Sequence, residues 1–301
     1  MSISISFIQQ VKNEQFTQKN KVTFCGTQKS DNFSSDYIKR KNRIITNLLH
    51  QKNVDKNGIK RLIDCPQEQE FNSLLFGYVQ RMTENIEYNH IDRCKDVLVN
   101  ILNRKGKSTL SEEQYFRNSG VDAYDRLSGL YKAVIEPDKD KEILLVKDIL
   151  KNKYGVKEMY FNNDVDSAKN WLETAKRVTE YGLNLPDIII TCPYVHSAGT
   201  NSMTSKGSMV VINPERAEYT GIESTKHPLH AYVHETVHCN QLSLISFNLL
   251  NVPDRFKETS DNISEYAKDN FMHEIHAELK TKQILSELSP IEKEFLDYIE
   301  R

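Results

Sequence analysis

Hydrophobic residues recur at intervals of three and four through most of the chain between Asp36 and Lys105, which is the spacing of one face of an α-helix. The clearest runs are Leu74, Leu75, Tyr78 and Met82, and Ile91, Cys94, Val97, Leu98, Ile101 and Leu102. This spacing predicts a small bundle of helices. Residues 1–34 are instead rich in Ser, Asn, Gln and Lys, so we expect a flexible N-terminal tail there, with one short strand near residues 22–24.

The period of the pattern changes in the second half of the chain. Helices are predicted over residues 124–135 and 141–153, and Gly155 is suited to cap the second of them because glycine tolerates a positive φ. Strands are then predicted over residues 156–161, 187–191 and 208–213, with a helix over residues 165–181 and a loop over residues 193–206. After about Glu223 the spacing is again helical, with short breaks.

These elements indicate an α+β chain in three parts. Its 301 residues are enough for two folded units. We expect a tail over residues 1–34, a helical bundle region of unknown role over residues 35–110, and a domain with a small mixed sheet over residues 111–301. Positive charges exceed negative ones by seven over residues 1–110, and negative charges exceed positive ones by nine after that, which also favours two units with different surfaces.

Composition limits the classes of partner and the cellular compartment that we expect for this chain. No apolar run approaches the ~18–20 residues of a membrane span, and the net charge of −2 gives no reason to expect nucleic acid as a partner. The five cysteines form no CxxC pair, which is typical of a reducing compartment. Because no secretory signal is readable at the N-terminus, a cytoplasmic location is the default expectation, and export as an effector by a signal-peptide-independent route is the alternative.

The strongest chemical signal is the sequence His-Glu-Thr-Val-His at residues 234–238. Histidines four residues apart on a helix project from the same face, so both imidazoles can hold one metal ion. The flanking apolar residues favour a helix over residues 226–244, with Ser224 or Thr225 as its N-cap. This is the HExxH arrangement of zinc enzymes.

A catalytic zinc ion needs a third protein ligand and leaves its fourth position to water. The candidate carboxylates downstream of the motif are Glu258, Glu265, Glu274 and Glu278. The segment around Glu258 has little apolar periodicity and reads as a connector. By contrast, a long helix is predicted from Asp269 or Asn270, and it carries Glu274 and Glu278 one turn apart.

We therefore expect His234, His238 and Glu274 to hold Zn²⁺. Glu235 would act as the general base on the zinc-bound water. Glu278 would accept a hydrogen bond from a ligand histidine and thereby fix the tautomer and orientation of its ring.

The chain also resembles a known family at this point. The segment Ser-Glu-Tyr-Ala-Lys-Asp-Asn at residues 264–270, followed by Glu-Ile-His-Ala-Glu at residues 274–278, resembles the Tyr-[Gly/Ala]-x-x-Asn…Glu-x-x-Ala-Glu segment of the gluzincins related to the catalytic domain of anthrax lethal factor. The resemblance implies that Glu274 is the zinc ligand and that Tyr266 stabilises the oxyanion. Here three residues, rather than two, separate the Asn from the Glu.

The resemblance extends upstream and covers roughly residues 140–301. The strands predicted before the HExxH motif are similar to the zincin sheet, which implies a zincin-like fold: a small mixed sheet, the active-site helix and C-terminal helices. The last strand of that sheet is an edge that lies along the active-site cleft. In this chain it would be the segment near Met209–Ile212, which could bind an extended peptide.

The resulting expectation is a zinc metallopeptidase that hydrolyses peptide bonds in a protein or peptide substrate. The alternative is a catalytically inactive zincin-like domain that serves as a protein-binding module or effector scaffold. The presence of both motif histidines and Glu235 favours the enzyme.

Other histidines and a cysteine near the motif are expected to have no direct role in metal binding or catalysis. We expect His230 to lie on the surface or to support a ligand, and His273 and His276 to lie on the surface of their helix. His196 is expected to be an incidental loop residue, and Cys239 a core thiol pointing away from the ligand face.

Overall fold

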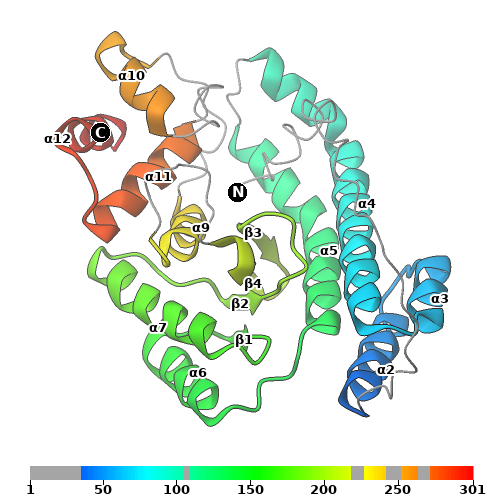
Figure 1. Cartoon of the computed structure of the whole chain (residues 1–301). Helices are drawn as coiled ribbons and strands as arrows, with labels where there is room; N and C mark the ends of the chain where they lie inside the picture. The colour runs from blue at the N-terminus through cyan, green and yellow to red at the C-terminus, as the bar shows by residue number, and fades with distance from the viewer. Residues whose placement is uncertain (1–34, 105–108, 218–226, 242–251, 264–271, 301) are drawn as a thin grey trace, which may run out of the picture.

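Helices and one small sheet make up the part of the chain that the computed structural model describes, which is residues 35–104, 109–217, 227–241, 252–263 and 272–300 (Figure 1). The helices are α2 (Ser35–Leu49), α3 (Lys56–Asp64), α4 (Glu68–Asn103), α5 (Leu110–Val134), α6 (Lys141–Tyr154), α7 (Val165–Glu180), α8 (Pro214–Ala217), α9 (His230–Asn240), α10 (Asp254–Ile263), α11 (Met272–Leu285) and α12 (Pro290–Ile299). The strands are β1 (Glu158–Tyr160), β2 (Ile188–Thr191), β3 (Gly199–Thr204) and β4 (Gly207–Ile212). The mixed helix and sheet content agrees with the predicted α+β class.

The helices predicted for the first third of the described chain are present as α2, α3 and α4. Asp55 begins α3 by accepting hydrogen bonds from the backbone of Asn57 and Gly58. Helix α5 begins at Leu110, well before the predicted segment 124–135, because Thr109 and Glu112 form a capping box that the apolar spacing did not reveal. None of the described helices has both the length and the apolarity of a membrane span.

The sheet has the strand order β1-β2-β4-β3. Strands β1, β2 and β4 are parallel, whereas β3 is antiparallel to β4, with Gly199 opposite Ile212 and Asn201 opposite Val210. Two predictions are therefore wrong. Strand β3 lies in the predicted loop 193–206, and the edge strand is β3 rather than the segment Met209–Ile212.

The physical reason lies in the polarity of β3. Its sequence, Gly-Thr-Asn-Ser-Met-Thr, has no apolar alternation, because the positions that it buries are Asn201 and Thr204. All of Met209 to Ile212 is buried, as expected of a strand with neighbours on both sides and covered faces. The continuous apolar run of β4 thus marks an inner strand.

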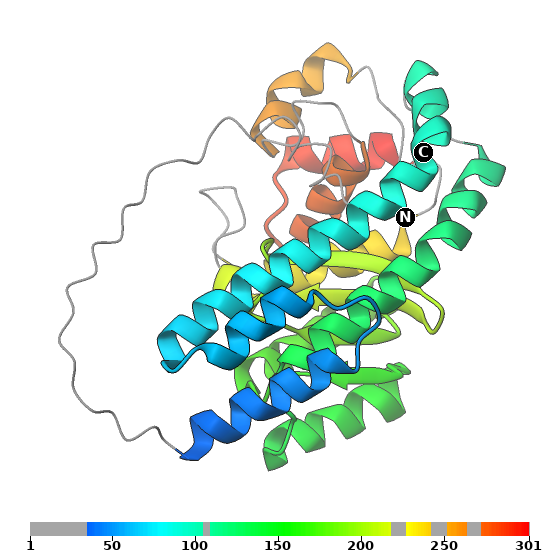
Figure 2. The ribbon, with the colours of Figure 1, turned by 90° about the vertical axis from the view of Figure 1, so that its right-hand side faces the viewer.

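Both faces of the sheet are covered. Alternate residues of each strand point to opposite faces, so Ile188, Ile190 and Val211 share one core with helices α2–α5, whereas Ile189 and Val210 share another with α6, α7 and α9. Figures 1 and 2 show the N-terminal helices on one side of the sheet, with α4 and α5 side by side. The predicted division at residue 110 stays a prediction, and the helices on its two sides belong to one core.

The C-terminal helices pack beside α9. Helix α11 packs along α9, and α10 and α12 pack against α11 around Phe256 and Phe295. The segment around Glu258, predicted as a connector, is the helix α10. Its apolar signal was weak because, over residues 254–261, Phe256 is its large buried apolar side chain and the other residues are polar or charged.

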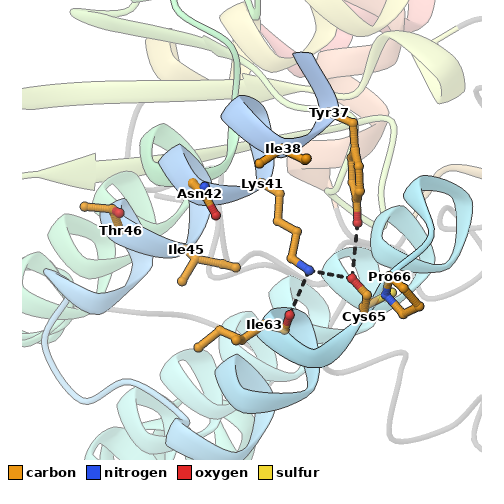
Figure 3. Close-up of a pocket in the computed structure, with 9 residues that line it drawn as sticks. All are labelled: Tyr37, Ile38, Lys41, Asn42, Ile45, Thr46, Ile63, Cys65 and Pro66. Carbon is orange, nitrogen blue, oxygen red and sulfur yellow. Dashed lines mark hydrogen bonds between the residues drawn. The ribbon is translucent and has the colours of Figure 1, made fainter. Parts of the chain in front are cut away.

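A groove of about 350 Å³ lies between α2 and α3 (Figure 3). Lys41 extends along it and donates hydrogen bonds from Nζ to the carbonyl oxygens of Ile63, at 2.7 Å, and Cys65, at 2.5 Å. A cation is favourable there because the last carbonyl groups of a helix lack intrahelical partners. The groove therefore contains the C-terminal capping contacts of α3.

An ion-pair cluster joins β1 to its neighbours. The Glu158 carboxylate accepts hydrogen bonds from Lys132 of α5, at 2.6 Å, and from Lys206 in the β3–β4 turn, at 2.5 Å. Burial by itself would raise the pKa of Glu158, but the two ammonium groups outweigh it and lower this pKa from 4.5 to about 2. The ionised carboxylate therefore stabilises the fold above about pH 4.5, and this contribution is lost as the pH falls from 4.5 towards 2.

We expect Glu158→Gln to lower the free energy of unfolding by about 1–3 kcal/mol at pH 7, the upper end being the linkage value for the pKa shift. The deficit should shrink as the pH falls from 4.5 towards 2, because the wild-type carboxyl then protonates as well. Urea unfolding at pH 7 and pH 3 measures it. Glu142→Gln, in an exposed ion pair with Lys169, is the control and should change stability by less than about 1 kcal/mol. A deficit for Glu158→Gln that is equal at both pH values would contradict the assignment.

Candidate metal centre

Helix α9 presents the HExxH motif between the sheet and α11. Ala231, Tyr232, Val233 and Val237 are buried against these neighbours, so the helix cannot rotate without exposing them. The helix begins at His230 rather than at residue 226, and its predicted caps Ser224 and Thr225 lie outside the described residues. With one face fixed in the core, α9 directs the two motif histidines toward α11.

The atoms predicted to bind zinc converge on one point. His234 Nε2 lies 3.0 Å from His238 Nε2, and Glu274 Oε2 lies 3.3 Å from the former and 3.4 Å from the latter. Tetrahedral zinc with ligand bonds of ~2.0–2.1 Å separates its ligand atoms by about 3.3–3.4 Å. Both distances to Glu274 thus have the spacing of a zinc site, and the distance between the two nitrogens is a few tenths of an ångström shorter. His234 and Glu274 each keep 18% of their side-chain surface exposed, which leaves access for a further ligand.

The charges around this triangle also suit a cation. Burial by itself would lower the pKa of His234, but the carboxylates of Glu274 and Glu278 outweigh it and raise this pKa well above 6.5. Burial would likewise raise the pKa of Glu274, but His238 and His234 hold it well below 4.5. The carboxylates of Glu274, which is partly buried, and Glu278, which is buried, thus favour positive charge at the point between the imidazoles, which a metal ion supplies.

Glu278 lies one turn after Glu274 on α11 and contacts the back of His234. Its Oε2 lies 3.5 Å from His234 Nδ1 and 2.9 Å from His230 Nε2. His230 is buried, so its predicted surface position is wrong, and its other predicted role, support of a ligand, stays a prediction. A proton on His234 Nδ1, facing this carboxylate, leaves Nε2 free as a ligand atom. The structure therefore brings Glu278 beside His234, but its hydrogen bond is with His230, so the predicted hydrogen bond to a ligand histidine stays a prediction.

Glu235 points to strand β3. Asn201 Nδ2 donates a hydrogen bond to Glu235 Oε2 at 2.8 Å. A Cβ atom on Gly199 would lie 2.6 Å from Glu235 Cγ, so the absence of a side chain at Gly199 is what lets the glutamate approach the strand. Sequence reasoning missed both β3 residues, because a polar strand gives no apolar alternation to detect.

Two histidines of α11 were predicted on its surface, and this is wrong. His273 and His276 are buried, with 1% and 8% of their surface exposed. His273 Nε2 lies 3.2 Å from the second carboxylate oxygen of Glu274. The error arose because α11 is surrounded by α9, α10 and α12, so its sequence lacks a polar face that would mark the exposed side.

Three further candidate residues do not contact this triangle of donors, or lie outside the described residues. Glu258 is exposed on α10 and belongs to neither of the groups of potential metal ligands found among the described residues. Tyr266 and Glu265 lie outside the described residues, so the predicted role of Tyr266 stays a prediction. The Cys239 thiol packs against the core beside the sheet, as predicted, and burial raises its pKa to about 12.

The second group of potential ligands is His230, His234 and Glu278. In this group His230 and Glu278 form an ion pair with each other at 2.9 Å, and Glu278 Oε2 lies 3.5 Å from His234 Nδ1. The group His234, His238 and Glu274 is the one with an accessible side. No protein-family model, curated protein or solved structure matches this chain. The geometry of this centre therefore carries the functional argument.

Proposed function

We propose that this protein is a zinc-dependent metallopeptidase of the gluzincin type. The observation that carries the proposal is the triangle of His234 Nε2, His238 Nε2 and Glu274 Oε2, whose sides of 3.0 to 3.4 Å fit a tetrahedral zinc ion. Two nitrogen donors and one carboxylate, with a side left accessible, are the donor set of a catalytic rather than a structural zinc site.

Bound Zn²⁺ would lower the pKa of a coordinated water toward ~7 and polarise the scissile carbonyl group. The protein supplies the proton transfers. Glu235 accepts the proton of the attacking water through its carboxylate, one oxygen of which Asn201 holds. As the C–N bond breaks, Glu235 gives this proton to the leaving amine nitrogen, so water is consumed and a carboxyl and an amine are released.

A peptide suits this site because of the strand beside it. Strand β3 pairs with β4 on one side only, and no other described strand pairs with its second edge. An extended peptide can form backbone hydrogen bonds with such an edge. Asn201 of β3 donates a hydrogen bond to Glu235, and Glu235 also lies close to Gly199 of the same strand. A peptide on this edge would therefore pass close to the proposed base.

Zinc content and cleavage of a peptide library test this proposal on the wild-type chain. We expect one zinc ion per folded chain by native mass spectrometry, and cleavage that a chelator abolishes and added Zn²⁺ restores. Folded protein that takes up no zinc would overturn the proposal. One bound zinc without cleavage of any peptide would overturn the peptidase and favour the alternative, a zincin-like binding module.

A further inference from the structure

A line of hydrogen bonds runs from the proposed zinc ligand His238 to the last described helix. Gln241 Oε1 lies 2.8 Å from His238 Nδ1. Gln241 Nε2 lies 2.5 Å from the carbonyl oxygen of His273 and 3.1 Å from His276 Nδ1. His276 Nε2 lies 3.2 Å from a carboxylate oxygen of Glu300, just after α12. The line thus joins α9, α11 and the end of α12.

The direction of every hydrogen bond in this line can be assigned. A carbonyl oxygen only accepts, so the atom of Gln241 that faces His273 must be its NH₂ group. The amide oxygen of Gln241 then faces His238 Nδ1, which must carry a proton. The same NH₂ group donates to His276 Nδ1, so the proton of the His276 ring is on Nε2, where the Glu300 carboxylate accepts it.

The tautomer of His238 decides whether its Nε2 can bind a metal ion. A neutral His238 ring with its proton on Nδ1 has a lone pair on Nε2, which is the atom that points at His234 and Glu274. The opposite tautomer would put a proton on Nε2 and could not bind a metal there. His238 itself is 96% buried, so water has little access to replace Gln241 at Nδ1.

We propose that Gln241 and His276 are positioning residues for the metal centre, and that they fix the tautomer and orientation of His238 from the α11–α12 side. The inference rests on the proposed function, because it presumes that His238 binds zinc. The inference goes beyond the proposed function, because it assigns His238 a hydrogen-bond partner whose chemistry differs from that of the carboxylate beside His234. The carboxylate of Glu278 lies 3.5 Å from His234 Nδ1, whereas a neutral amide, itself oriented by His276, is hydrogen-bonded to His238.

The positioning role of Gln241 and His276 can be tested without any substrate, by measuring Zn²⁺ affinity in competition with a chromophoric chelator. Gln241→Met has a similar size but only a weakly accepting sulfur and no donor, and it should weaken Zn²⁺ binding by about 10–100-fold, the usual effect of losing a hydrogen-bond partner of a ligand histidine. Gln241→Glu keeps an acceptor for His238 Nδ1 and should bind Zn²⁺ at least about tenfold more tightly than Gln241→Met. This pair separates the hydrogen bond from packing.

The second step of the line has its own pair of variants. His276→Leu removes the acceptor for the Gln241 NH₂ group and should weaken Zn²⁺ binding by about 3–10-fold, less than the loss of Gln241 itself. His276→Asn offers an oxygen near the position of Nδ1 and should restore most of the affinity. The control is Glu292→Gln, which perturbs the contact between α11 and α12 at Lys282, 2.6 Å away, but lies outside this line.

The variant His238→Ala distinguishes a failure of the positioning role from a failure of the proposed metal centre. If Gln241→Met remains folded and binds Zn²⁺ as the wild type does, while His238→Ala has lost binding, the positioning role is wrong and the proposed metal centre stands. The positioning role is also wrong if Glu292→Gln weakens binding as much as His276→Leu, since loosened packing would then explain both. If His238→Ala binds Zn²⁺ as tightly as the wild type, the proposed function itself fails.

Discussion

The substitution Glu235→Gln is expected to leave zinc bound and to lower kcat for peptide cleavage by about 10²–10⁴-fold, the usual contribution of a general base. Glu235 is not one of the three converging donors, so its loss should not disturb them. A glutamine amide oxygen can still accept the hydrogen bond from Asn201, so the contact with β3 is kept. An amide cannot take up the proton of the attacking water, and this is the only function that the substitution removes.

Steady-state kinetics with a peptide found in the library, together with the zinc content of the same preparation, measures this effect. Glu180→Gln, an exposed residue at the end of α7, is the control and should match the wild type. If Glu235→Gln retained the wild-type kcat with one zinc bound, Glu235 could not be the base. If it lost the zinc instead, the assignment of the ligands would need revision.

The second large effect is expected at the third ligand. Glu274→Gln should abolish tight Zn²⁺ binding, because a neutral amide oxygen is a much weaker ligand than a carboxylate and no longer balances the charge of the cation. The stabilisation that zinc gives the wild type should disappear as well. At a free zinc concentration 1,000 times the dissociation constant, that stabilisation is about 4 kcal/mol.

Chemical unfolding with and without Zn²⁺, and a chelator competition, measure this loss. Glu258→Gln is the matched control, since Glu258 was the competing candidate in the sequence and lies exposed on α10. It should keep wild-type affinity and the full stabilisation by zinc. The reverse pattern, with zinc lost only in Glu258→Gln, would mean that the carboxylate converging on the two histidines is not the ligand.

Much of this arrangement was predictable because it depends on local periodicity. The spacing of His234 and His238 is a property of one helix turn, and the apolar spacing after residue 269 placed Glu274 and Glu278 on one helix. The structure brings these four side chains together. Helices such as α4 and α7 and the buried strand β2 also give strong local patterns.

The remainder depends on contacts between distant segments. The burial of His273 and His276 follows from the packing of α9, α10 and α12 around α11, which no window of sequence contains. The position of β3 follows from its pairing with β4, because its own residues are polar. Gln241 is visible only through its contacts, since a glutamine just after a helix has no distinctive spacing.

The turn between β3 and β4 controls the register of the strand that faces the proposed base. Residues two apart on a strand share a face, so Gly199 and Asn201 both face Glu235 because Thr204 is paired with Gly207. Lengthening the turn at Ser205 and Lys206 by one residue with a matching slip of β3 would present the neighbouring residues of β3 instead. The two-residue turn at the far end of β3 thus determines which residues of this strand contact Glu235.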